Sequence, residues 1–195
     1  MTKKHELLKT DTINISNKTL YRIKALKSFS NVTKGDLGGY VQSEDNLSHN
    51  GLCWIYDNAK VFGNARIYDN AKVYYNAWVH DNAMVFNNAR IYDNARVYNN
   101  AWVYDKAIIY DNARVYDNAK ILDNVIVYGH GRVYNNDIVC GNARVYSNIF
   151  GNIKKSIIID EIQEPNKCNH EFKEYIGLTE VYQYCTKCDV KKSNK

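Results

Sequence analysis

The chain has 195 residues and a formal net charge of +5, a length typical of one domain or of one domain with a small appendage. Hydrophobic residues make up 45% and charged residues 24% of it, a balance that excludes a wholly disordered chain. No apolar run approaches the roughly 20 residues that a membrane span requires. The first residues contain no apolar signal-peptide core, so we expect a cytoplasmic protein without membrane contact.

Positive and negative charges are spread evenly along the chain. Residues 1–54 hold eight Lys or Arg against five Asp or Glu, and the later segments 55–150 and 151–195 are closer to balance. No segment has the dense basic surplus of proteins that hold extended nucleic acid mainly through phosphate contacts. Any anion site must therefore come from the arrangement of a few side chains.

Residues 1–54 form a leading segment that lacks the repeat found further on. Within it, Leu20–Phe29 has strand or short-helix character, and the glycine-containing stretches Lys34–Val41 and Asn46–Trp54 follow. An open solenoid end exposes strand edges that would recruit other chains. We therefore expect this segment to cap the repeat that begins at residue 55, with His5 in a leading tail.

A six-residue repeat occupies residues 55–150, giving 16 units without an insertion. The first position is always Ile or Val, the second is mostly Tyr, the fourth is Asn in 14 units and the fifth is Ala in 12. Regrouped as Ala-Arg-Val-Tyr-Asp-Asn, each unit predicts a short strand with Ala and Val pointing to one side. The Asp-Asn pair predicts a corner, with Asn the better residue for a left-handed backbone conformation.

This pattern resembles the hexapeptide-repeat family, and with the preceding cap it is most similar to the bacterial and phage YdcK-type putative acetyltransferases. The resemblance implies an all-β left-handed parallel β-helix of about five triangular coils. It also implies that three chains pack side by side as a homotrimer. Members carry their name because of the fold, so the resemblance implies the fold more firmly than the reaction. The repeat decays at Val125, Gly131, Asp137 and Ile149, and we expect residues 151–164 to close the solenoid.

A second kind of segment begins at residue 165. It contains a Cys-x-His pair and a Cys-x-x-Cys pair, which together offer four zinc ligands. We predict a small zinc-ribbon-like module over residues 165–195 with a structural Zn²⁺, because four protein ligands leave no open position; the alternative is that these residues are unrelated. The predicted ligands are Cys168, His170, Cys185 and Cys188.

Every third repeat unit stacks on the same face of the solenoid. The outward residues of one face are therefore found in the sequence at intervals of 18 residues, and they form columns along the solenoid. One face carries alternating Arg and Tyr side chains, which suit a small anionic, nucleotide-like ligand. The plainer interpretation is that Tyr is a good strand former that stacks on itself between coils, and that Arg supplies solubility. The predicted ligand-binding residues are Arg96, Tyr98, Arg114, Tyr116, Arg132 and Tyr134.

Another face carries the most apolar outward column, and monomers rarely leave such a patch in water. We predict that it forms the trimer interface. Its residues are Met84, Phe86, Trp102, Tyr104, Leu122 and Ile138.

Three functions remain open from the sequence. The favoured one is a non-catalytic binding protein, of phage type, that sequesters a small anionic ligand or a host protein. The second is acyl transfer from acyl-CoA, which the resemblance implies; His80 and His130 are the candidate bases, although neither has an acidic partner in its motif. The third is a structural or protein-interaction scaffold, which the caps at both ends disfavour.

Overall fold

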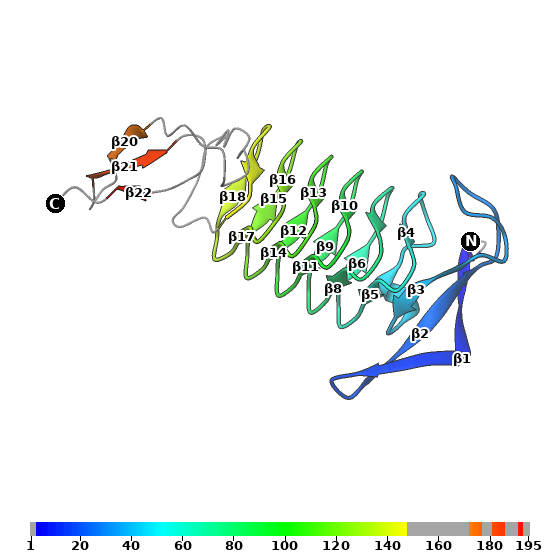
Figure 1. The fold of residues 1–195 in the computed structure, drawn as a ribbon. Coiled ribbons are helices and arrows are strands. Elements are labelled where there is room, and N and C mark those ends of the chain that lie inside the picture. The colour runs from blue at the N-terminus through cyan, green and yellow to red at the C-terminus, as the bar shows by residue number, and fades with distance from the viewer. Residues whose placement is uncertain (1–2, 148–171, 177–180, 186–190, 193–195) are drawn as a thin grey trace. The chain divides into compact units, whose positions relative to one another are not determined.

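The computed structural model describes residues 3–147, 172–176, 181–185 and 191–192 (Figure 1). The chain divides into two units, Met1–Ile157 and Ile158–Lys195. The described residues form strands and one short 3-10 helix, Glu44–Asn46, and no α-helix. None of the helices in this described part is long and apolar enough to cross a membrane. The expectation of an all-β fold is confirmed.

The first unit begins with a β-hairpin rather than with the expected tail. β1 (His5–Ile15) pairs antiparallel with β2 (Lys18–Ala25). Ser16 and Asn17 connect them with φ angles of 48° and 63°, the two left-handed residues that a tight type I′ hairpin turn requires. The hairpin is coloured dark blue in Figure 1 and projects beside the first coils.

The third strand joins this hairpin to the solenoid. β3 (Leu37–Val41) pairs antiparallel with β2 and parallel with β5 (Lys60–Val61), so the pairing changes direction at β3. The backbone of β3 lies against the neighbouring coil: a Cβ at Gly39 would lie 2.5 Å from the Ala59 carbonyl oxygen. Larger residues at this position would push the hairpin away from the solenoid.

Each repeat unit of residues 55–145 contributes one two-residue parallel strand, and each strand pairs with the strand three units later (Figure 1). Three strands make one turn, and three sheets result. The first sheet continues β1-β2-β3-β5 with β8 (Trp78–Val79), β11 (Arg96–Val97), β14 (Arg114–Val115) and β17 (Arg132–Val133). The second contains β4 (Trp54–Ile55), β7 (Lys72–Val73), β10 (Arg90–Ile91), β13 (Ile108–Ile109), β16 (Ile126–Val127) and β19 (Arg144–Val145). The third contains β6 (Arg66–Ile67), β9 (Met84–Val85), β12 (Trp102–Val103), β15 (Lys120–Ile121) and β18 (Ile138–Val139).

The solenoid has about six turns, one more than the repeat count predicted. The additional turn is irregular: it consists of β3, the bridge from Leu47 to Ile67, and β4. Apart from Ile55, the residues of this turn precede the first repeat unit, so the sequence pattern assigns them to the cap. In this turn the buried side-chain amide of Asn46 takes the place of backbone N–H donors to the next coil. It donates to the Gly63 and Ala65 carbonyl oxygens at 3.0 and 2.8 Å.

The interior of the solenoid holds the Val or Ile column and the Ala column of the repeat. The Ala column is fully buried from Ala59 to Ala119, and the Val and Ile side chains beside it are also buried. Burying one Val or Ile side chain contributes about 1.5–3 kcal/mol, so the repeated column supplies most of the apolar stabilisation. Asp137 replaces Ala near the end and is 2% exposed, where its burial raises the pKa of its carboxyl.

The corners differ from the expectation in one respect. The left-handed residue is the Asp of each Asp-Asn pair and not the Asn that follows it, with φ between 52° and 60° at Asp57, Asp93 and Asp123, for example. Gly63, Gly129 and Gly141 occupy the same position with positive φ. The Asn side chains are therefore free for another role, which is described below.

The Asp carboxylates explain why the left-handed position favours Asp. Oδ2 of Asp117 accepts a hydrogen bond from the backbone N–H of Asn135, one coil later, at 3.1 Å. The same contact joins Asp123 to Gly141 at 2.8 Å. Eight such bonds run along the corners, so each carboxylate gives a partner to a corner amide that would otherwise have only water.

The second unit contains a three-stranded antiparallel sheet in its described residues. β20 (Phe172–Ile176) pairs with β21 (Val181–Cys185), which pairs with β22 (Lys191–Lys192). The predicted closing segment, residues 151–164, lies outside the described residues.

Candidate functional site

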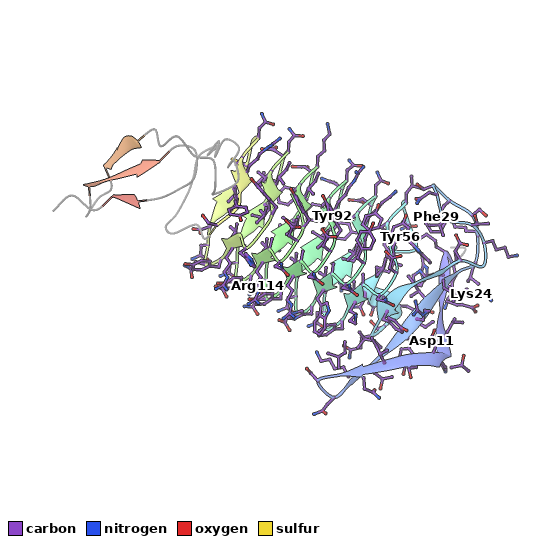
Figure 2. The ribbon with its side chains drawn as sticks, viewed as in Figure 1. Asp11, Lys24, Phe29, Tyr56, Tyr92 and Arg114 are labelled. Atoms are coloured by element: carbon purple, nitrogen blue, oxygen red, sulfur yellow. The ribbon has the colours of Figure 1, made fainter. Side chains whose placement is uncertain are left out.

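The structure brings the six predicted ligand-binding residues together on the first sheet. Each Arg is the outward first residue of its strand, Val follows inward, and Tyr points outward again. Arg96 pairs in register with Arg114, and Arg114 pairs with Arg132. Arg114 lies on an outer surface of the solenoid (Figure 2). We call this surface the Arg/Tyr face; it consists of Arg96, Tyr98, Arg114, Tyr116, Arg132 and Tyr134.

The three guanidinium groups of the Arg/Tyr face have no carboxylate partner within residues 3–147. The ion pairs of that range are Lys3–Glu44, Arg22–Asp11, His49–Glu44 and His80–Asp81. The Arg96 guanidinium lies 5.1 Å from the centre of the Trp78 ring, a cation–π contact that leaves its charge unneutralised. Three like charges therefore stand one coil apart, about 4.8 Å, which attracts anions to this face.

The Tyr rings of this face stack on one another along the solenoid. Ring centres lie 5.0 Å apart between Tyr98 and Tyr116 and 5.2 Å apart between Tyr116 and Tyr134, with interplanar angles of 1° and 9°. Each inner ring therefore has a neighbour over both faces. A flat ligand cannot insert there, so the accessible part of an inner Tyr is its edge with the hydroxyl.

These hydroxyls are hydrogen-bond donors at neutral pH. Burial raises the pKa of the Tyr98 phenol, and the neighbouring Tyr116 raises it further. Burial and the neighbouring Tyr134 likewise raise the pKa of the Tyr116 phenol. Tyr98 and Tyr116 therefore stay neutral and add no negative charge beside the guanidinium groups.

A polar groove runs along the corner that follows the Arg/Tyr face. It has a volume of about 870 Å³ and is open to solvent. One wall is a ladder of exposed Asn carboxamides, in which Asn82 donates to Asn100 at 3.0 Å and Asn100 donates to Asn118 at 3.1 Å. The sequence pattern assigns these Asn residues to turns, and the signal for the ladder is the recurrence of Asn at the same corner in every coil. We call this surface the amide groove; it is lined by Lys18, Gln42, Gly63, Asn64, Asp81, Asn82, Asn99, Asn100, Asp117, Asn118, Asn135 and Asn136.

His80 has the acidic partner that its motif was thought to lack. Its Nδ1 lies 3.0 Å from Oδ2 of the adjacent Asp81. Its ring stacks between Phe62 and Tyr98, with ring centres 4.9 and 5.1 Å away. Burial lowers the pKa of His80 although the Asp81 charge opposes this effect, so the imidazole is neutral at neutral pH and can accept a proton.

The second candidate base is less constrained. His130 is an exposed corner residue at a position usually occupied by Asn. No ion pair or side-chain hydrogen bond orients it within the described part of the chain. The structure does not bring it together with His80, because β16 and its corner lie three coils from His80.

The six predicted interface residues share the third sheet and the corner beside it. Phe86 stacks with Tyr104 at 4.8 Å between ring centres and meets Trp102 edge to face at 6.3 Å. Of the six side chains, Ile138 is exposed, at 37%, and the other five are half-buried. We call this surface the apolar face; it consists of Met84, Phe86, Trp102, Tyr104, Leu122 and Ile138.

The predicted zinc ligands fall mostly outside the described residues. Cys168, His170 and Cys188 lie outside them, and Cys185 is the last residue of β21. Elsewhere, residues 3–147 contain no group of three or more His, Cys, Asp or Glu side chains placed to hold a metal ion. Cys53 and Cys140 are free thiols.

A buried polar cluster at the N-terminal end was not anticipated from the sequence. Lys4 Nζ donates to the Cys53 carbonyl oxygen at 2.9 Å and lies 3.2 Å from Cys53 Sγ. The fully buried His5 packs against His49 with ring centres 4.3 Å apart, and neither His5 ring nitrogen has a partner in the described structure. Burial and then the neighbouring His49 lower the pKa of His5 to about 3. The alternation of β1 is the signal in the sequence that favours a strand at His5 over the predicted tail.

The comparisons with known proteins agree with this architecture. A family model described as the YdcK Beta solenoid repeat matches residues 65–81 and 89–105. Both stretches lie among the regular coils; the first contains β6, β7 and β8, and the second contains β10, β11 and β12. The comparison with curated proteins gave no match. The protein is a parallel β-solenoid whose coils include two stretches that match the YdcK type of repeat.

Proposed function

We propose that this protein is a non-catalytic binding protein that captures an anionic ligand on the Arg/Tyr face. The observation that carries the proposal is the row of Arg96, Arg114 and Arg132, which stands in register without a carboxylate partner in residues 3–147. Natural surfaces usually mix both signs of charge. A guanidinium offers paired donors to carboxylate or phosphate oxygens, and the neutral Tyr hydroxyls add further donors.

The stacking of the Tyr rings limits how such a ligand binds. An inner ring such as Tyr116 has neighbours on both faces, so a nucleotide would bind through its phosphate groups and not by stacking its base within the column. A rigid solenoid positions the Arg side chains before the ligand arrives, which reduces the entropy lost on binding.

Calorimetry with nucleotides, inorganic phosphate and tricarboxylates tests the proposal. We expect one member of this panel to bind at low salt, and Arg114→Ala to weaken it at least tenfold because a central guanidinium is lost. Arg90→Ala is the matched control, since it removes the same charge from the second sheet. If Arg114→Ala binds every anion as the unchanged protein does, or if Arg90→Ala has an equal effect, the Arg/Tyr face is not the site.

Acyl transfer is the second candidate, and the His80–Asp81 contact of 3.0 Å favours it. A carboxylate at Nδ1 orients an imidazole so that Nε2 can act as a general base. Acetyl-CoA hydrolysis or transfer to amine acceptors would report this activity. If turnover occurs and His80→Gln abolishes it while Arg114→Ala does not, catalysis replaces capture as the function.

We also propose that the protein forms a homotrimer through the apolar face. Phe86, Trp102 and Ile138 place apolar surface on one side of the solenoid, where a partner would shield it from water. Light scattering after size-exclusion chromatography gives the mass directly. Trp102→Arg should convert the trimer to monomer, and a monomeric unchanged protein would contradict the proposal.

A structural Zn²⁺ in the second unit is a further proposal. Phe172 pairs with Cys185 across β20 and β21, so the chain enters this hairpin and leaves it at the same end. The Cys-x-His pair precedes that end and the Cys-x-x-Cys pair begins at it. A unit of this size buries little apolar surface, and zinc binding would supply its folding free energy.

We propose a left-handed winding for the solenoid, with three repeat units per triangular turn. The uninterrupted six-residue repeat supports this hand, since it is the sequence pattern of left-handed parallel β-helices. Crystallography of the purified protein tests this hand, and a right-handed path would contradict the proposal.

A further inference from the structure

We infer that the anion captured on the Arg/Tyr face is a linear polyuronate, a chain of pyranose rings bearing carboxylates, that lies along the solenoid axis between the Arg row and the amide groove. This inference rests on the proposed function and names the class of its ligand. Three rows of side chains that repeat once per coil carry it.

The three rows run side by side because they occupy neighbouring positions of the same repeat unit. In one coil, Arg96 is followed outward by Tyr98 and then by the corner residues Asn99 and Asn100. The next coil repeats this order from Arg114, which pairs with Arg96 in strand register. The surface therefore presents a guanidinium, a phenol hydroxyl and a carboxamide at intervals of about 4.8 Å.

A ligand that uses all coils must repeat at a similar interval. Extended chains of pyranose rings do so, with about one ring per coil, and their carboxylates and hydroxyls project from the ring edges. Carboxylates match the guanidinium row. Sugar hydroxyls both donate and accept hydrogen bonds. Each inner Asn of the ladder uses one N–H and one oxygen lone pair for its neighbours, so one N–H and one lone pair are left for the ligand hydroxyls.

The geometry disfavours the other linear polyanions. Single-stranded nucleic acid gains much of its affinity by stacking bases on aromatic faces, but neighbours cover both faces of Tyr116. Polyphosphate has no hydroxyl or ring to engage the amide groove. An edge-on contact between a sugar chain and the Tyr hydroxyls requires no free aromatic face.

The charges within the groove orient the chain. The charged residues that line the groove are Lys18, which lies over the Phe62 ring, and the carboxylates of Asp81 and Asp117, whose Oδ2 atoms each accept a hydrogen bond from a backbone N–H of the next coil, at 3.3 and 3.1 Å. The two carboxylates repel ligand carboxylates from the coils that they line, so the ligand carboxylates lie over the Arg row. The hydroxyl edges then lie toward Asn100 and Asn118. A neutral sugar chain would gain nothing from the Arg row.

The row is long enough to make affinity depend on ligand length. Lys60 continues the row of cations toward the N-terminus, beyond the uncharged Trp78 that pairs with both Lys60 and Arg96, so the outward column presents four cations over five coils. A ligand of one or two rings meets at most two of these positions, whereas five rings meet all of them.

Calorimetric titration of the full chain with oligomannuronates or oligogalacturonates of one to six rings tests the inference. We expect the dissociation constant to fall at least 30-fold from the dimer to the pentamer and then to level off. The uncharged cello-oligosaccharides, which carry hydroxymethyl groups in place of carboxylates, should not bind. Polyphosphate and poly-glutamate serve as linear polyanions without pyranose rings and should bind at least tenfold more weakly per chain.

Variants localise the binding. Arg114→Ala and Asn100→Ala should each weaken the pentamer at least fivefold, Arg114→Lys less than Arg114→Ala, and the control Arg90→Ala not at all. Both changed residues lie at the surface, and circular dichroism verifies that the variants are folded. Flat length dependence, equal binding of polyphosphate, or an unaffected Asn100→Ala would overturn the inference.

The same titrations separate failure of this inference from failure of the proposed function. If a small anion binds through Arg114 but pentauronate neither binds nor competes with it, anion capture stands and the polyuronate is wrong. If Arg114→Ala changes the binding of neither ligand class, both are wrong.

Discussion

Tyr75 occupies a position that suits it poorly. Among the described corners it is the one bulky residue at the left-handed position, with φ of 54° and 55% of its surface exposed. A left-handed conformation costs most residues about 1–2 kcal/mol, and Asp and Asn tolerate it better. The carboxylate that would accept the Asp93 N–H, as Asp93 itself does for Asp111 at 3.3 Å, is also missing at residue 75.

We therefore expect Tyr75→Asp to increase the free energy of unfolding by about 1 kcal/mol. The gain comes from relieved backbone strain and one new corner hydrogen bond. Urea denaturation followed by circular dichroism measures it. Asp111→Gly is the matched opposite change, because Gly keeps the left-handed conformation and removes only the acceptor for the Gly129 N–H; it should lower stability by about 1 kcal/mol. A destabilised Tyr75→Asp variant would contradict this account of the corners.

His5 makes the N-terminal end sensitive to acid. Burial, followed by the neighbouring His49 and Lys4, lowers its pKa to about 3 in the folded chain, against about 6.5 in the unfolded chain. The unfolded chain thus binds more protons between these values, so stability falls as the pH decreases from about 6.5 toward 3. The hydrogen bond from Lys3 lowers the pKa of Glu44. Protonation of Glu44 therefore causes a further loss of stability at more acidic pH.

Replacing His5 with Leu should remove the His5 part of this pH dependence. The variant and the unchanged protein should differ little at pH 8, and the variant should become relatively more stable by up to several kcal/mol as the pH approaches 4. Thermal unfolding at pH values from 4 to 8 gives the comparison. A constant difference across this range would show that His5 is not buried in its neutral form.

At the scale of elements, the Asn side chains of the amide groove add hydrogen bonds between coils that are already joined by backbone hydrogen bonds. Asn100 donates to Asn118 and accepts from Asn82 at 3.1 and 3.0 Å, whereas Asn112 at another corner makes no side-chain hydrogen bond in the described structure. Asn100→Ala should therefore cost about 1 kcal/mol, and Asn112→Ala close to nothing. Chemical denaturation of both variants tests this difference, and equal losses would mean that the ladder contributes no stability.

The zinc proposal is also tested at this scale. Metal analysis of the purified protein should give one zinc per chain, and Cys185→Ser should lower this ratio because one of four ligands is lost. A chelator should release the metal and abolish the circular dichroism contribution of β20–β22, with the solenoid signal unchanged. The proposal would be contradicted if the purified protein contained no zinc and also bound none after refolding in the presence of zinc.

At the scale of the whole molecule, the sequence predicted what the repeat controls. The parallel strands, three sheets and buried Val and Ala columns follow from side-chain alternation and from the stacking of every third repeat unit. The outward columns of Arg114 and Tyr116 could be placed for the same reason. The stacking of the Tyr rings follows from the same column and agrees with the plainer interpretation of this face, although the alternation alone gives the side on which a ring lies and not the tilt of its plane.

Where the repeat is absent, prediction was weaker. The hairpin of β1 and β2 depends on long-range contacts, such as Lys4 with Cys53, that no short-range pattern encodes. The irregular first turn was missed for the same reason, since the Asn46 amide acts there as a backbone substitute. The left-handed corner residue was misassigned because intrinsic preference favours Asn, whereas the carboxylate contact to the next coil favours Asp.

The direction of the hydrogen bonds between coils has a mechanical consequence. Every ladder bond runs along the solenoid axis, as from the Trp78 N–H to the Ala95 carbonyl oxygen at 2.9 Å. A force applied along this axis loads the bonds of one coil before those of the next, so the structure peels instead of shearing. Each released coil of three repeat units adds about 60 Å of extended chain. Under tension, the solenoid would therefore lengthen in steps of equal size, one for each turn that unfolds.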